Sequence, residues 1–324
     1  MKGSLIRKGG TRFFAFPYSF PGSLIVPLRT NSSACKSLPR APERPLRLSW
    51  NGGSLCARVK RCLDSEIDSQ GATTPLLGYL FMAGYIDAIS FSAIFVWCGF
   101  QTGNFAQVSL AVARAIEGYY KTPHPTGLVN VLAELPKQDR ASLCSLIAFL
   151  SGLAIFGRLG DRLGTHKKGW LVGGTLIQAL LTLVSAITFY LLESKAPLAL
   201  SFHFLNDFAR GSGLYFVGIA CLSASLGVQG IMARRLGSAF STTIVLTAIF
   251  VELVADPTFF QVTRPVRSRD QKWLAVFALF LGVVVGRLIL GQLGTACTIG
   301  VGVLFRVAIA GSFLVVPGTH VHLP

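Results

Sequence analysis

Long apolar runs alternate with short polar connections along the chain, and this pattern predicts its architecture. Unbroken apolar stretches of about 18 residues or more are typical of membrane-spanning helices. The candidate spans are residues 76–100, 101–116, 141–158, 169–192, 212–231, 239–255, 272–293 and 297–316. Because the segment 101–116 is short and begins with polar residues, we expect about seven spans, within a range of roughly 6–8.

Composition agrees with this pattern. Hydrophobic residues make up 52% of the 324-residue chain and charged residues only 14%, whereas a soluble domain carries about 25% charged residues. The predicted fold class is therefore an all-α integral membrane protein, a bundle of transmembrane helices. The seven cysteines are scattered without metal-ligand spacing, so we interpret them as reduced packing residues and expect neither a metal site nor a cofactor.

The positive charge is concentrated before the first span. Of a net charge of +16, residues 1–61 contribute twelve Lys and Arg against one acid, Glu43. We therefore divide the chain into a basic, disordered tail (1–60), a membrane domain (61–316) and a short tail (317–324). Three interpretations of the basic tail stay open: a cytoplasmic tail attracted to anionic lipid, a mitochondrial presequence, and a wrongly assigned start.

Partners and location follow from the same features. We expect the lipid bilayer and a small solute as partners, and no nucleic acid, because the basic residues do not alternate with aromatic ones. Three prolines in the tail, at 17, 21 and 27, would break the helix of a presequence. The plasma membrane or an endomembrane is therefore favoured over the mitochondrial inner membrane. Homo-oligomer formation stays open.

Asp87 is the sharpest exception to the apolar pattern. It lies in the run AGYIDAISF (83–91), and a carboxylate at membrane depth costs about 2.5–3.5 kcal/mol on insertion scales. Ser90 lies three residues further on and shares its helical face. Two interpretations compete: a proton, cation or substrate site, and a carboxylate that hydrogen-bonds a neighbouring helix.

A second exception is the polar group Gln101-Thr102-Gly103-Asn104. Gly103 permits a break of the backbone, and Thr102 or Asn104 could cap the helix that follows. Such a helix start exposes free N–H groups that suit an anionic ligand. The alternative is a tight turn between two spans at the membrane surface.

An internal repeat is suggested by matching segments in residues 76–192 and 212–316. QTGNFAQVSLAV (101–112) resembles STTIVLTAIFVEL (241–253), and a Gly-Arg pair follows later in each half. Four segments per half would make the two halves parallel. The polar residues of the second half that correspond to 101–104 are Gln229, Thr242, Thr243 and Thr247.

Other charges near the spans have simpler interpretations. Glu252 resembles an interfacial carboxylate. Arg287 and Arg306 could each pair with Asp87 or extend to the headgroups, and we expect at least one of them to extend. His203 and Asp207 are four residues apart, but the sequence supplies no further metal ligand.

Five motifs in a fixed order carry a family resemblance. They are AGYIDAISF (83–91), QTGNFAQVSLAV (101–112), SLGVQGIMARRLGSAFSTTIVLT (225–247), ELVADPTFF (252–260) and FLGVVVGRLI (280–289). With them the chain, from about residue 60 to 312, resembles the YoaK-like family of uncharacterised multi-pass membrane proteins, and most of all its fungal branch. The resemblance puts Asp87, Thr102-Gly103-Asn104, Gln229 and Asp256 at motif positions, and it implies the architecture rather than a reaction.

The functional hypothesis is a small-solute transporter or permease with a polar site in the middle of the membrane. In it, Asp87 would be the titrating or ion-coupled group, and residues 102–104 would contact the substrate. The alternative is a non-transporting scaffold or accessory subunit whose polar residues hold helices together. No nucleophile, base and metal set can be assembled, so we expect no enzyme.

Overall fold

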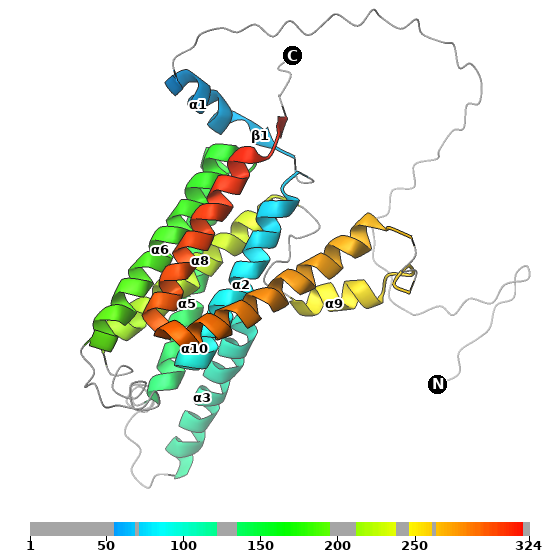
Figure 1. The fold of residues 1–324 in the computed structure, drawn as a ribbon. Helices are drawn as coiled ribbons and strands as arrows, with labels where there is room; N and C mark the ends of the chain where they lie inside the picture. The colour runs from blue at the N-terminus through cyan, green and yellow to red at the C-terminus, as the bar shows by residue number, and fades with distance from the viewer. Residues whose placement is uncertain are drawn as a thin grey trace, which may run out of the picture. The chain divides into compact units, whose positions relative to one another are not determined.

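A computed structural model describes residues 55–68, 71–121, 135–194, 212–237, 246–260 and 264–319, which are almost entirely helical (Figure 1). The helices are α1 (Leu55–Asp64), α2 (Thr73–Ile94), α3 (Gln101–Lys121), α5 (Lys137–Leu163), α6 (Lys168–Ser194), α8 (Gly213–Arg235), α9 (Leu246–Val254) and α10 (Arg267–Val315). Two short strands, β1 (Glu66–Ile67) and β2 (Gly318–Thr319), pair antiparallel. They join the segment before α2 to the segment after α10.

Five of these helices are long and apolar enough to cross a membrane: α2, α5, α6, α8 and α10. The last of them is interrupted at Gly294, where φ is 76° and ψ is 179°. This backbone conformation is essentially restricted to glycine. The break divides α10 into a first arm, residues 267–293, and a second arm, residues 295–315, which match two of the expected spans.

The expected all-α class is confirmed, and the five apolar helices fit a membrane bundle. The count of seven spans stays a prediction. Helix α3 occupies the expected segment 101–116 and is 21 residues long, but its most apolar stretch is less apolar than those of these five helices, and α9 is nine residues long. The basic tail lies outside the described residues, apart from the start of α1 at Leu55, and the division into two repeats stays a prediction.

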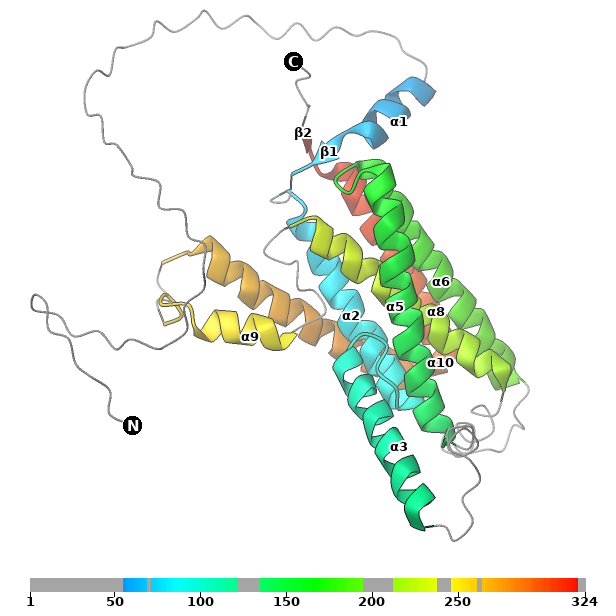
Figure 2. The same cartoon turned by 180° about the vertical axis from the view of Figure 1, so that it is seen from behind.

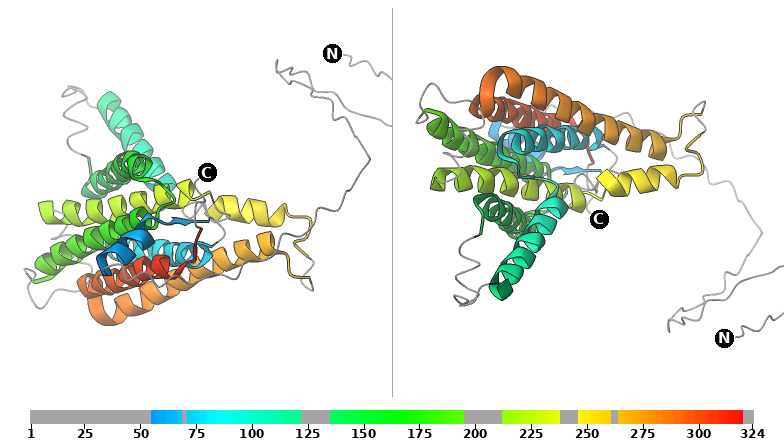
Figure 3. Two further views of the ribbon diagram at one scale, coloured as in Figure 1. Left: turned by 90° about the horizontal axis from the view of Figure 1, so that it is seen from above. Right: turned by 90° about the horizontal axis from the view of Figure 1, so that it is seen from below.

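Helix α2 lies at the centre of the bundle. In its most apolar stretch 72% of the residues are buried, against 28% in α5 and in α10, and it packs against α8 and extensively against α10. Helix α3 runs beside α5 (Figure 2). Seen along the bundle, α3 and α10 lie on opposite sides of it (Figure 3). The polar residues in the middle of α2, Asp87 and Ser90, are therefore buried in protein.

In each of two helix pairs, glycines let the two helices approach each other closely. A Cβ atom at Gly84 of α2 would collide with the carbonyl oxygen of Leu279 in α10, and one at Gly282 would collide with that of Phe81. The α5–α8 pair repeats this arrangement. Its glycines lie against the carbonyl oxygens of the partner helix as Gly152 on Ala224 and Gly227 on Phe149. Small residues at these positions let membrane helices associate by backbone contact.

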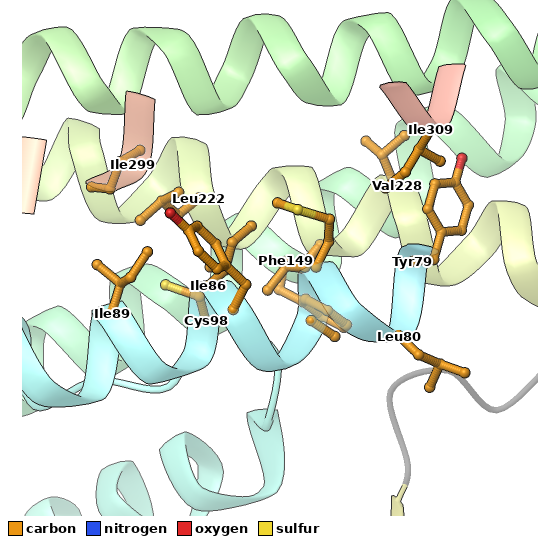
Figure 4. Packing of buried hydrophobic residues seen from close by; sticks show 14 of the residues in the cluster. Tyr79, Leu80, Ile86, Ile89, Cys98, Phe149, Leu222, Val228, Ile299 and Ile309 are labelled. Carbon is orange, nitrogen blue, oxygen red and sulfur yellow. The ribbon is translucent and has the colours of Figure 1, made fainter. Parts of the chain in front are cut away.

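The apolar core lies between α2, α8 and the second arm of α10 (Figure 4). Its labelled side chains form one group with Ile86, Ile89, Leu222 and Ile299, and another with Tyr79, Val228 and Ile309. Large apolar side chains on the outer faces of α5, α6 and α10 are exposed. Such outward apolar faces are what a lipid environment requires. Two clusters of buried polar side chains interrupt the core.

Candidate functional site

The first cluster surrounds the segment that joins α2 to α3. Asp87 is 1% exposed, and its Oδ1 atom accepts hydrogen bonds from the backbone N–H groups of Cys98 at 2.9 Å and Gly99 at 2.7 Å. Its Oδ2 atom is buried and has no hydrogen-bond partner among the described residues. The carboxylate therefore anchors the joining segment by accepting backbone N–H groups that α2 and α3 leave free.

Asn104 holds the same segment from the other side. Its Oδ1 atom accepts the N–H of Trp97 at 3.3 Å, and its Nδ2 atom donates to the carbonyl oxygen of Trp97. Nδ2 also lies 2.9 Å from Oγ of Ser145 in α5, which in turn is 2.8 Å from Oγ of Ser223 in α8. Gln101 donates to the carbonyl oxygen of Cys98 at 2.7 Å. We call Asp87, Gln101, Asn104, Ser145 and Ser223 the loop cluster.

The expected break at residues 101–104 is wrong in position. Residues 101–104 form the first turn of α3, and the chain leaves the helix earlier, at Phe95, whose φ is 59°. Gly103 is needed for space, because a Cβ there would lie 2.9 Å from the ring of Trp97. Thr102 and Gly103 are exposed, whereas Asn104 is buried. The indole of Trp97 stacks on Phe91, and this local packing places the turn.

The second cluster surrounds Arg306 in the second arm of α10. This side chain is fully buried. Its Nη1 atom donates to Oε1 of Gln178 in α6 and, at 3.5 Å, to Oε1 of Gln229 in α8. Its Nη2 atom donates to Oγ of Ser225 at 3.1 Å. The expectation that Arg306 pairs with Asp87 or extends to the headgroups is therefore wrong, because α6 and α8 pack around it and supply neutral oxygen acceptors instead.

Further polar groups complete this cluster. The hydroxyl of Tyr79 in α2 lies 2.6 Å from Oγ1 of Thr175 and accepts from Nε2 of Gln178 at 3.4 Å. Nε2 of Gln229 donates to the carbonyl oxygen of Tyr79 at 2.8 Å. We call Tyr79, Thr175, Gln178, Ser225, Gln229 and Arg306 the arginine cluster. It connects four helices, α2, α6, α8 and α10.

The sequence pattern indicated only some residues of the arginine cluster. Gln229 was a candidate site residue and lies in it, but Gln178 and Thr175 were missed. The feature that identified Asp87, a polar side chain within a long apolar run, also marks Gln178 and Thr175. Their run is VGGTLIQALLTLV (172–184). Gln229 joins Arg306 and not Asp87.

A small apolar void lies one helical turn from the arginine cluster. It is lined by Tyr85, Ile86, Ile89, Thr182, Leu222, Ile299 and Gly302. Thr182 follows Gln178 by four residues and Gly302 precedes Arg306 by four, so the void continues along two helices of the cluster. It has no room for a water molecule in this conformation.

The break in α10 carries a carboxylate that the sequence did not indicate. Oε1 of Glu193, at the end of α6, accepts the backbone N–H groups of Thr295 at 3.1 Å and Ala296 at 3.3 Å. These are the first N–H groups of the second arm, where a negative charge is favourable. Glu193 thus fixes the start of the arm that carries Arg306.

Of the remaining sequence candidates, Ser90 adjoins the loop cluster, and the others make no contact with Asp87 or lie outside the described residues. Ser90 is buried, and its hydroxyl donates to the carbonyl oxygen of Asp87 at 3.4 Å. Thr247 and Arg287 are exposed. Glu252 lies 3.6 Å from Nζ of Lys272. Neither Arg287 nor Glu252 therefore pairs with Asp87. Outside the described residues lie His203, Asp207, Thr242 and Thr243.

Asp256 stabilises a turn after α9. Its Oδ1 atom accepts the backbone N–H of Thr258 at 2.9 Å and the hydroxyl of the same residue at 2.6 Å. These hydrogen bonds hold the pKa of the Asp256 carboxyl below its usual value. In the described part of the chain, no three His, Cys, Asp or Glu side chains gather as a metal site requires.

The fold and its buried polar clusters define an α-helical membrane protein. A protein-family profile described as "Protein of unknown function (DUF1275)" matches residues 76–311. The chain belongs to this family. A search of the curated proteins finds no match, and neither does a search of the solved structures.

Proposed function

We propose that this protein is a small-solute transporter or permease whose polar site is the arginine cluster. The observation that carries the proposal is the fully buried guanidinium of Arg306, held by neutral side chains of α6 and α8. Ionisable groups inside membrane spans are expensive, and they usually mark solute or ion pathways.

The surroundings of the cluster support this proposal. The α2–α10 and α5–α8 pairs have the same reciprocal glycine contacts, and the arginine cluster takes residues from a helix of each pair. Many transporters are built from two repeats with the solute site at their interface. The equivalence of the two pairs is the basis on which we propose two repeats.

Asp87 favours a second candidate, the scaffold or accessory subunit. A scaffold needs its polar residues only for holding elements together, and Asp87 bonds backbone N–H groups in a site that excludes solvent. We therefore move the proposed solute site away from residues 102–104. A titrating role for Asp87 stays a prediction from the sequence, as do the lack of enzymatic activity and of nucleic-acid binding.

The finer family and location assignments are also proposals. The order of the five motifs supports a place in the YoaK-like group and in its fungal branch, and a tree of family members tests that placement. The basic segment before the first span supports the plasma membrane or an endomembrane. Imaging of the full chain tagged at its carboxyl end, beside markers of each membrane, tests that location.

Reconstitution of the purified full chain in liposomes tests the transport function. Uptake of labelled amino acids, sugars, carboxylates and inorganic ions would be followed for the wild type, Arg306→Gln and Arg287→Gln. Arg287 is the matched control, because it lies on the same helix but is exposed. We expect one solute to enter with the wild type and Arg287→Gln but not with Arg306→Gln. Uptake no faster than in protein-free liposomes, with correctly folded protein, would favour the scaffold.

A further inference from the structure

The hydrogen bonds of Arg306 leave part of its guanidinium unused. Nη1 and Nη2 donate to Gln178, Gln229 and Ser225, whereas the buried Nε–H has no acceptor among the described residues. Nε–H and the adjacent Nη2–H form the edge that binds a carboxylate or another oxyanion with two parallel hydrogen bonds. Of the two nitrogens of that edge, Nη2 donates to the neutral hydroxyl of Ser225, and Nε has no acceptor among the described residues.

The charge of Arg306 also lacks a counter-ion within the described residues. The acceptors of its hydrogen bonds are all neutral, and it takes part in no ion pair there. The two acids described above have other partners: Asp87 accepts from Cys98 and Gly99, and Glu193 accepts from the start of the second arm. A buried ion costs several kcal/mol unless an opposite charge and hydrogen bonds compensate it.

We propose that Arg306 binds a small oxyanion, such as a carboxylate, sulfate or phosphate, through its Nε–H and Nη2–H edge. This assignment rests on the proposed transport function and names the class of its solute. The anion supplies both the missing negative charge and the missing acceptor. A neutral solute would supply only the acceptor and leave the buried charge uncompensated.

The void described above offers a route by which an anion could reach Arg306. Two of its lining residues, Thr182 and Gly302, lie one helical turn from Gln178 and Arg306, and Leu222 lies three residues before Ser225. The void therefore continues from the arginine cluster along three of its helices. An oxyanion needs more room than this conformation offers, so binding requires these helices to separate by a small distance at the void.

Thermal unfolding of the purified full chain in a neutral detergent tests the proposal. Sodium acetate, sulfate, phosphate and chloride would each be titrated at constant ionic strength. We expect a saturable rise in Tm with at least one oxyanion for the wild type and Arg287→Gln, and none for Arg306→Gln. Arg306→Lys keeps the charge but cannot donate two parallel hydrogen bonds to one oxyanion, so we expect its affinity for the oxyanion to fall by about tenfold or more. Equal rises in the wild type and Arg306→Gln, or no rise in the wild type, would overturn the inference.

A second variant keeps the test decisive even where Arg306→Gln does not fold. Ser225→Asp places a carboxylate beside Nη2, where the hydroxyl now lies 3.1 Å away. This built-in counter-ion should keep or raise Tm without added anion and abolish the oxyanion response. A lower Tm with an unchanged oxyanion response would show that the anion binds elsewhere. Ser225→Asn, which matches the size without the charge, is the control.

Lipid headgroups carry the same phosphate chemistry as a free oxyanion. The titration repeated in nanodiscs of phosphatidylcholine alone, and with phosphatidylglycerol, separates the two sources. Protection by soluble oxyanions in both membranes identifies a free solute. Protection that requires phosphatidylglycerol identifies a lipid headgroup and overturns the solute assignment.

If an oxyanion binds but never enters liposomes, transport fails and the binding site stands. If only a neutral or cationic solute enters, transport stands and the oxyanion assignment fails.

Discussion

The loop cluster and the arginine cluster compensate the burial of an ionisable side chain in different ways. Each contains a buried ionisable side chain in the helical core, Asp87 in one and Arg306 in the other. Asp87 accepts backbone N–H groups whose positions are fixed by the chain between α2 and α3. Arg306 donates to side-chain oxygens of Gln178 and Ser225, which can rotate. The first arrangement is suited to holding an element in place, and the second can exchange a partner for a ligand.

The largest effect should follow when Asp87 loses its acceptor atoms. Asp87→Leu leaves the N–H groups of Cys98 and Gly99 buried without a partner, at about 1–3 kcal/mol each. We therefore expect a free energy of unfolding lower by about 2–6 kcal/mol. Asp87→Asn keeps an oxygen acceptor and should lose clearly less. Unfolding in detergent, followed by circular dichroism, measures both, and equal losses would contradict an anchoring role.

A smaller effect is expected at Gln178, the first acceptor of Arg306. Gln178→Leu removes a hydrogen bond to a charged group and should lower the free energy of unfolding by about 1.5–3 kcal/mol. Adding Arg306→Met removes the buried charge, so the double variant should recover most of the loss. A double-mutant cycle measures this coupling. Additive losses would mean that Arg306 does not depend on Gln178.

Asn104 should have a more local effect. Asn104→Ala removes the hydrogen bonds to Trp97 and Ser145 and should cost about 1–2 kcal/mol, since the joining segment can regain some of them from water. Hydrogen exchange should become faster at residues 97–104 and stay unchanged in the arginine cluster. Thr102→Ala, at an exposed neighbouring position, is the control. Faster exchange around Arg306 as well would show that the two clusters are coupled.

The smallest effect is expected at Glu193. Glu193→Gln keeps an oxygen for the N–H groups of Thr295 and Ala296 but removes the charge at the start of the second arm, which is worth about 0.3–1 kcal/mol. Tm should fall slightly. Ser194→Ala should leave Tm unchanged, because Ser194 is exposed and its hydroxyl donates to the carbonyl oxygen of Leu191 in its own helix. An equal fall in both variants would argue against a capping role.

The sequence by itself determined where the apolar helices lie. Six of the expected spans overlap α2, α5, α6, α8 and both arms of α10, with ends that differ by up to six residues, since a run of apolar side chains is a local property. It also showed that Asp87, Asn104 and Gln229 are unusual for their surroundings, because a polar side chain in an apolar run is visible without any partner.

The tertiary structure alone decided what these side chains do. Arg306 and Gln178 are 128 residues apart in sequence, and hydropathy records that a position is apolar or polar but not which helix faces it. The turn between α2 and α3 lies at 95–100 because Asp87 and Asn104 bind its backbone from two sides. Arg306 stays in the core because α6 and α8, which are distant from it in sequence, bring acceptors to it. Only the packing of these helices could place the acceptors beside Arg306.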